Sequence, residues 1–186
     1  MDLFFRYWWI YMFLYDEENI KTWLEKFRKY PSIVVYWKMF GSSGKLTREK
    51  ELVIEEFYVS WSKLVNIGKV FFNTNFEIKK NKVHIIDSII NLFGKKITIP
   101  SINQYKKFIK YEIHIKGLKK TTIQINHYWS KTYNEYRNKK IIRGDVFFLD
   151  KKRTLEDFYD KELKCIDVDY KIFRFLIKLK ERYYKL

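Results

Sequence analysis

The stretch Gly94-Lys-Lys-Ile-Thr-Ile-Pro-Ser101 lies near the middle of the most basic part of the chain. A glycine leads into a pair of lysines, a short segment of alternating apolar and polar residues, and then a proline. This order is typical of a β-turn that presents cations beside a strand, because glycine favours turns and proline ends strands. We therefore predict a hairpin-like element here, around which the rest of the protein is organised.

Positive charge is concentrated in one block of the sequence. The 186 residues carry 38 Lys and Arg against 22 Asp and Glu, which gives a net charge of +16. Residues 1–62 are neutral, whereas residues 63–143 contain eighteen cationic and four anionic side chains, and residues 144–186 contain eleven and nine. Such segregation indicates an anionic partner, either nucleic acid or an anionic membrane surface.

The composition bounds the class of protein. Hydrophobic residues make up 47% of the chain and aromatic residues 20%, enough for the core of one domain, or of one small domain with extensions. Alanine is absent and Lys, Ile, Phe and Tyr dominate, which indicates an AT-rich genome, most simply an organellar or reduced one. The single Cys165 excludes an internal disulfide and a cysteine-built zinc site. The three histidines are scattered, so we expect no metal and no cofactor.

The first fifteen residues, Met1–Tyr15, are strongly apolar and aromatic. They fall short of the roughly 20 residues that span a bilayer. They also lack the basic start and small-residue cleavage site of a secretory signal, and the Arg/Ser-rich pattern of an organelle import peptide. We interpret them as a buried or partner-docking element, with membrane contact as an alternative that we do not prefer. For an organellar protein, the missing import signal favours synthesis inside the organelle.

Helical spacing and capping residues predict three helices. They are Asp16–Tyr30, Thr47–Val65 and Thr154–Lys164. The segment Phe76–Lys82 fits a basic helical turn, and Ile33–Phe40 fits either a strand or a short buried helix.

Strict alternation of apolar and polar residues predicts a strand at Phe108–Lys116, followed by a basic turn and a second strand at Thr121–Tyr128. Further strands are expected at Val146–Leu149 and Cys165–Ile172. In Trp129–Arg143, cations alternate with aromatic residues, which suits stacking on nucleotides together with phosphate contact. A solvated loop in an aromatic-rich protein explains this segment equally well.

Only one group of residues suggests metal-dependent chemistry. Asp167 and Asp169, followed by Lys171, have the acid-acid-lysine order of some metal-dependent nucleases, in which two carboxylates hold Mg²⁺ and a lysine steadies a hydroxide. The same residues also fit one face of an ordinary amphipathic strand, which is the interpretation that we prefer. We predict that the protein is not an enzyme.

Gly94–Ser101 resembles the Asn-Gly-Lys-Lys-Val-Asn-Ile-Pro-Ser element of the small-subunit ribosomal protein S-four family, with Phe93 in place of the asparagine. Phe76–Lys80 is similar to the basic second helix of that family's RNA-binding motif, and Ile166–Lys171 to a strand of its organellar members. The resemblance implies an α+β fold. It implies a small RNA-binding module of two short helices on a twisted antiparallel sheet. The helical and alternating patterns described above add N-terminal helices and a β-rich C-terminal extension.

We therefore expect three regions: an aromatic and helical region at 1–62, a basic RNA-binding domain at 63–116, and an extension at 117–186. The expected function is that of a structural constituent of a mitochondrial small ribosomal subunit. Its partners would be ribosomal RNA and, through the aromatic N-terminus, neighbouring ribosomal proteins. The residues expected to bind RNA are Lys79, Lys80, Lys82, Lys95, Lys96, Lys106, Lys107, Lys110, Lys119, Lys120, Arg137, Lys139, Lys140 and Arg143. The alternatives are an accessory subunit of an organellar inner-membrane complex and a small metal-dependent nuclease.

Overall fold

A computed structural model describes the backbone of residues 9–13 and the whole of residues 19–81, 84–109, 121–144, 150 and 152–184. The chain forms two compact units, each assembled from separate segments. The first unit contains Lys38–Ser62 and the described part of Asn126–Leu186. The second unit contains the described parts of Tyr11–Trp37 and Lys63–Ile125. The three regions expected from the sequence divide the chain by charge, whereas these units group segments that lie far apart along it.

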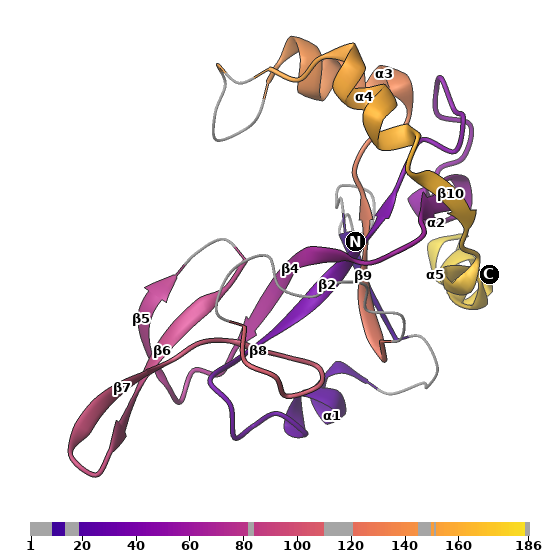
Figure 1. The fold of residues 1–186 in the computed structure, drawn as a ribbon. Helices are drawn as coiled ribbons and strands as arrows, with labels where there is room; N and C mark the ends of the chain where they lie inside the picture. Colours follow the sequence, from indigo (N-terminus) through magenta and orange to yellow (C-terminus); the bar gives the residue numbers. More distant parts are fainter. Residues whose placement is uncertain are drawn as a thin grey trace. The chain divides into compact units, whose positions relative to one another are not determined.

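Strand β2 (Ser32–Phe40) organises the larger sheet (Figure 1). Its residues are mostly β-branched or aromatic, and nearly all are buried, as in a strand that is covered on both faces. Hydrogen-bonded neighbours follow the order β1-β9-β2-β3-β10, and β4 and β8 also pair with β2. The bounds of these strands are β1 (Trp9–Phe13), β3 (Val59–Trp61), β4 (Val65–Phe72), β8 (Ile102–Asn103), β9 (Ile123–Tyr128) and β10 (Cys165–Val168).

In the second unit, β4 runs antiparallel to β2 and packs very closely against it. A Cβ atom at Gly68 would lie 1.8 Å from the carbonyl oxygen of Val35, so only glycine fits at this position. The core of this unit contains Val34, Tyr36 and Ile109. Of the two interpretations of Ile33–Phe40, the strand is correct, because these residues form most of β2.

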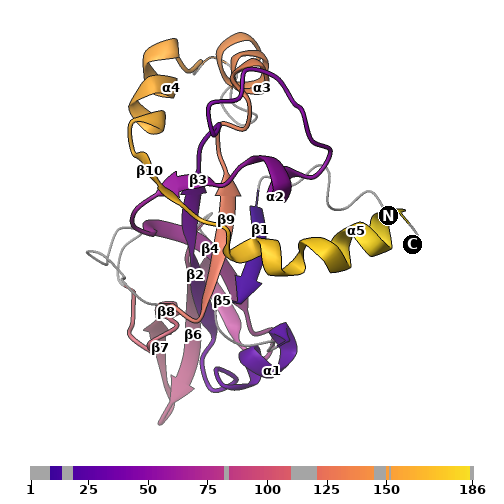
Figure 2. The ribbon, with the colours of Figure 1, turned by 90° about the vertical axis from the view of Figure 1, so that its right-hand side faces the viewer.

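In the first unit, two helices pack together through aromatic rings. Helix α3 (Tyr133–Tyr136) continues into a π-helix, η1 (Arg137–Ile142), and Figure 2 shows α3 beside α4 (Leu155–Glu162). The rings of Tyr136 and Phe158 join the two helices, with centroids 5.0 Å apart. The remaining helical elements of the unit are α2 (Val53–Glu56), the 3₁₀-helix η2 (Lys171–Phe175) and α5 (Leu176–Tyr184).

The α+β class is confirmed. The prediction of a basic helical turn at Phe76–Lys82 is wrong. Glu77–Asn81 forms strand β5, because hydrogen bonds to β6 stabilise the extended chain more than one isolated helical turn is stabilised. The described residues between 63 and 116 contain strands β4 to β8 and no helix. The two short helices implied by the family resemblance are therefore not found in this part of the chain.

Two further helices are shorter than expected. The helix expected at Thr47–Val65 is reduced to α2, because the Arg48 guanidinium donates to the carbonyl oxygens of Lys50 and Glu51 and holds this segment outside a helix. The helix expected at Asp16–Tyr30 is present as α1 (Ile20–Glu25), whose N-cap is Asn19. Residues 14–18 lie outside the described part.

The expectations beyond residue 108 have mixed outcomes. Strand β9 and helix α4, with its Thr154 cap, are confirmed. The strand expected at Cys165–Ile172 ends at Val168, because the Asp169 carboxylate accepts a hydrogen bond from the Lys171 amide and starts η2. The described part of the C-terminal extension is thus mainly helical and not β-rich. The strands expected at Phe108–Lys116 and Val146–Leu149 lie almost wholly outside the described residues.

Candidate nucleic-acid interface

Three strands of the second unit form a separate antiparallel sheet, drawn in pink and magenta in Figure 1. They are β5 (Glu77–Asn81), β6 (Ile86–Leu92) and β7 (Lys95–Ile99). Residues that lie opposite each other in neighbouring strands share a face of the sheet. Ile89 lies opposite both Glu77 and Thr98, and Asn91 lies opposite Lys96. The register therefore shows which side chains lie on the same face of the sheet.

A β-bulge in β5 brings two consecutive lysines to one face of this sheet. The register shifts between Ile78 and Lys80, so that Lys79 is the extra residue and Lys80 lies opposite Asp87. The Lys79 ammonium donates to the Thr98 hydroxyl at 2.7 Å, which places it on the same side as Lys80.

Lys96 joins them, because it lies two residues from Thr98 along β7. We call this side the lysine face, and define it by Lys79, Lys80, Asn91, Lys96 and Thr98, all of which are exposed.

The ammonium groups of the lysine face are largely without protein partners. Among the residues that the structure describes, Lys80 and Lys96 form no ion pair and no side-chain hydrogen bond. Glu77 and Asp87 lie on the same side, yet neither pairs with one of these lysines. This arrangement leaves cations available to an external anion.

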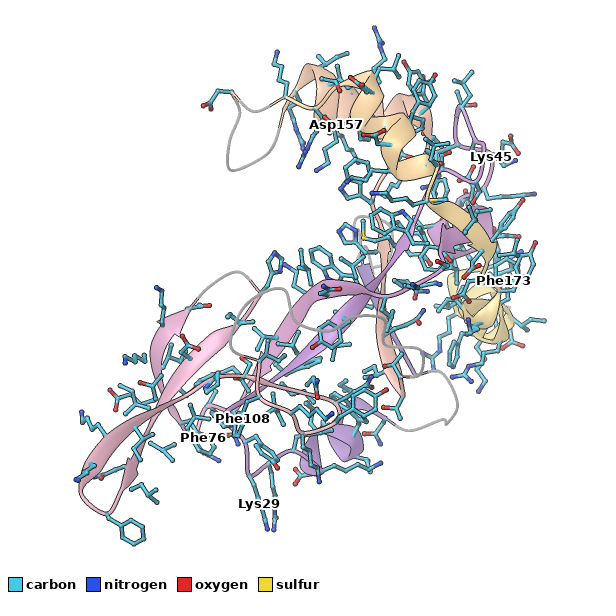
Figure 3. The ribbon with its side chains drawn as sticks, viewed as in Figure 1. Lys29, Lys45, Phe76, Phe108, Asp157 and Phe173 are labelled. Atoms are coloured by element: carbon cyan, nitrogen blue, oxygen red, sulfur yellow. The ribbon has the colours of Figure 1, made fainter. Side chains whose placement is uncertain are left out.

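The opposite side of the sheet is aliphatic, and we call it the aliphatic face. It carries Ile78, Ile90, Leu92 and Ile97, together with Lys95, which lies opposite Leu92. Figure 3 shows side chains standing out from β6 and β7 on both sides. Lys95 and Lys96, consecutive in the sequence, therefore point to different faces of the sheet.

A buried hydroxyl network ties this sheet to β2. The Ile86 amide donates to the Ser101 hydroxyl oxygen at 3.0 Å, and the Ser101 hydroxyl lies 2.9 Å from the Ile86 carbonyl oxygen. Ser32 of β2 completes the network, with its hydroxyl oxygen 2.8 Å from that of Ser101. Ser101, the last residue of the stretch Gly94–Ser101, thus anchors the end of β7.

The predicted site residues fall into separate groups. Lys106 and Lys107 are exposed on a turn after β8, where the Asn103 side chain accepts hydrogen bonds from the amides of Tyr105 and Lys107. A φ of 60° at Lys106 completes this turn. The remaining described cations of the predicted site lie in η1 or directly after it, in the first unit: Arg137, Lys139, Lys140 and the C-cap Arg143. Four others lie outside the described residues: Lys82, Lys110, Lys119 and Lys120.

The acid-acid-lysine group of the first unit is closed by ion pairs. The Lys38 ammonium lies 3.6 Å from Asp167, and the Lys171 ammonium lies 3.1 Å from the buried carboxylate of Asp169. Burial lowers the pKa of Lys38, although Asp169 and Asp167 oppose this shift. Within the described residues, no three His, Cys, Asp or Glu side chains converge to hold a metal ion. These carboxylates therefore form ion pairs, of which Lys38–Asp167 joins β2 to β10 and Lys171–Asp169 is local.

Comparison of the chain with protein-family models, curated proteins and solved structures gave no match. Among the described residues, no helix has the length and apolar character needed to cross a membrane.

Sequence reasoning missed two residues of the lysine face, Asn91 and Thr98. The bulge depends on the register between β5 and β6, which no local pattern encodes. The turn and hairpin-like element predicted at Gly94–Ser101 are confirmed, because β6 and β7 pair on either side of Phe93 and Gly94.

Proposed function

We propose that the protein is a non-enzymatic RNA-binding protein whose lysine face contacts the phosphate backbone. The bulge in β5, which sets Lys79 and Lys80 on the same face as Lys96, is the observation that carries this proposal. Lysines two strands apart are separated by about 10 Å, a distance that a phosphate backbone crossing the sheet spans. Contacts of this kind hold an RNA in place without reading its bases.

The RNA that we propose is ribosomal RNA in a mitochondrial small subunit, where the protein would be a structural constituent. This finer proposal is supported by the likeness of Gly94–Ser101 to the S-four family element and by the alanine-free composition. Neighbouring ribosomal proteins are the proposed partners of the aromatic segment Met1–Tyr15.

A charge-matched pair of variants tests RNA binding. One variant changes Lys79, Lys80 and Lys96 to Gln, and its control changes three exposed lysines near α1 to Gln: Lys21, Lys26 and Lys29. Affinity for a fragment of small-subunit ribosomal RNA is measured against salt concentration. The first variant should lower the slope of log affinity against log salt by about 2, since each phosphate contact contributes about 0.7–0.9. The control should keep the wild-type slope, and equal losses in both variants would refute the proposal.

Fractionation tests the ribosomal assignment separately. The protein should sediment with small ribosomal subunits and be released from membranes by an alkaline carbonate wash. Retention in the washed membranes would refute that assignment and favour an accessory subunit of a membrane complex.

A further inference from the structure

The loop between β6 and β7 exposes a large aromatic side chain. It consists of Phe93 and Gly94, because Leu92 and Lys95 are the last residues to pair across the hairpin. The Phe93 side chain is 96% exposed. Exposure of nearly a whole phenyl ring places it in contact with water, where it makes no contribution to the core.

Phe93 also adopts a backbone conformation that suits it poorly. Its φ is 51° and that of Gly94 is 76°, which is the pattern of a type I′ turn. Asparagine, aspartate and glycine are preferred at the first position of this turn, whereas a bulky residue there is strained. The five residue pairs between β6 and β7 hold the turn in place. Since neither local conformation nor burial favours phenylalanine, its ring is best explained by contact with another molecule.

Polar and charged side chains lie beside the turn on both faces of the hairpin. The pair next to the turn is Leu92 and Lys95, and the following pair is Asn91 and Lys96. All four side chains are exposed, and the two lysines flank the tip on opposite faces. The tip thus combines a flat apolar ring, an amide and two cations.

We infer that Phe93 stacks on an unpaired nucleobase, while Lys95 and Lys96 bind the phosphates on either side of it. This inference rests on the proposed RNA binding and specifies the form of RNA that the tip recognises. Every base offers a flat surface to an aromatic ring, but only an unpaired base exposes it. An anionic membrane is a less favoured ligand. Only Phe93 and Leu92 of the tip could enter the hydrocarbon layer, because the charged side chains of Lys95 and Lys96 lie within three residues of the ring.

Three substitutions at one position test the inference. Phe93→Asn removes the ring and suits the turn, Phe93→Leu keeps an apolar side chain without a flat ring, and Phe93→Trp keeps the ring. Affinities are measured for a short single-stranded RNA and for a duplex of the same sequence. Phe93→Asn and Phe93→Leu should lower single-strand affinity by roughly tenfold to a hundredfold, with the salt slope unchanged. Phe93→Trp should bind as tightly as the wild type, and duplex affinity should not change in any variant.

Two outcomes would overturn the stacking inference without refuting RNA binding by the lysine face. A third outcome would refute the proposed function itself. If the three-lysine variant loses RNA affinity and Phe93→Asn does not, the lysine face binds RNA and the ring has no part in it. Co-sedimentation with phosphatidylserine-containing vesicles provides the second arm. Binding to vesicles that is kept by Phe93→Leu and lost by Phe93→Asn, without any effect on RNA, would make the tip a membrane-contacting element instead. Failure of the three-lysine variant to lose RNA affinity would refute the proposed function itself.

Discussion

Four cations of the first unit are paired with carboxylates, whereas two cations of the lysine face are paired with none that the structure describes. In the first unit, Arg48 lies 2.8 Å from Glu56, and the Lys180 ammonium lies 2.6 Å from Glu55. Lys38 and Lys171 pair with the two aspartates near β10. On the lysine face, the ammonium groups of Lys80 and Lys96 have no such partner among the described residues. Net charge therefore does not tell which cations are available to an external anion, whereas the pattern of ion pairs does.

Buried polar side chains reinforce the closed character of the first unit. The Glu162 carboxylate accepts hydrogen bonds from the Ser42 amide at 3.0 Å, the Ser42 hydroxyl at 2.7 Å and the Ser130 hydroxyl at 2.6 Å. These contacts join α4 to the loop Gly41–Gly44 and to Ser130. Changes in the first unit should therefore act on stability, and changes on the lysine face should act on binding.

The largest expected effect is on the reactivity of Cys165 in the first unit. Burial raises the pKa of this thiol to about 12, and the nearby Glu162 carboxylate adds to the shift. At about pH 8 the folded protein should hold roughly a thousandfold less thiolate than the unfolded chain. Alkylation by iodoacetamide should be slower by a similar factor in the native protein than in denaturant.

The same thiol predicts a stability change with pH. In the unfolded chain it ionises near pH 9, whereas in the folded protein it stays protonated up to about pH 12. This thiol therefore stabilises the folded state below pH 9, and the stabilisation is lost as the pH rises toward 12. A Cys165→Ser variant should lose stability less steeply over this range, and identical profiles would contradict the assignment.

The next largest effect is expected for Glu56→Ala. The Glu56 side chain is fully buried, accepts a hydrogen bond from the Glu49 amide at 2.6 Å and pairs with Arg48. Its loss should lower the free energy of unfolding by about 3 kcal/mol, because Arg48 and the amide are left without their partner. Chemical denaturation measures this change. Asp160→Asn, at an exposed position on α4 with no ion pair to a described residue, serves as the control and should leave the unfolding midpoint unchanged.

A smaller loss is expected for Ser101→Ala in the second unit. Removal of the hydroxyl leaves the Ile86 amide without its acceptor, which should cost about 1–2 kcal/mol. Hydrogen exchange should show faster opening of β6 and β7 than of β2. Uniform destabilisation of all three strands would show that the network does not hold this sheet in particular.

The smallest effect on stability is expected from the three-lysine variant itself. Lys80 and Lys96 contribute no ion pair with a described residue, so the Gln variant should unfold within about 0.5 kcal/mol of the wild type. Thermal and chemical unfolding measure this difference. A loss comparable with that of Glu56→Ala would mean that these lysines serve the fold, and the contrast between the two regions would fail.

The elements that depend on local sequence patterns could be predicted from the sequence. Those that depend on pairing with a strand distant in the sequence could not. Strand β9 and helix α4 follow from alternation and from the Thr154 cap, and both are confirmed. Phe76–Lys82 has a helical spacing that hydrogen bonds to β6 override. The basic block at 63–143 was visible in the sequence. The bulge that selects Lys79, Lys80 and Lys96 from it depends on register, which only the partner strand determines.

Lysine footprinting tests the central claim most directly. The protein, alone and bound to a small-subunit ribosomal RNA fragment, is acetylated under limiting conditions, and the modified lysines are quantified by mass spectrometry. Lys79, Lys80 and Lys96 should be protected by the RNA, while Lys21 and Lys29 stay equally reactive in both samples. Protection of the α1 lysines with no protection on the lysine face would contradict the assignment of this sheet as the RNA-binding surface.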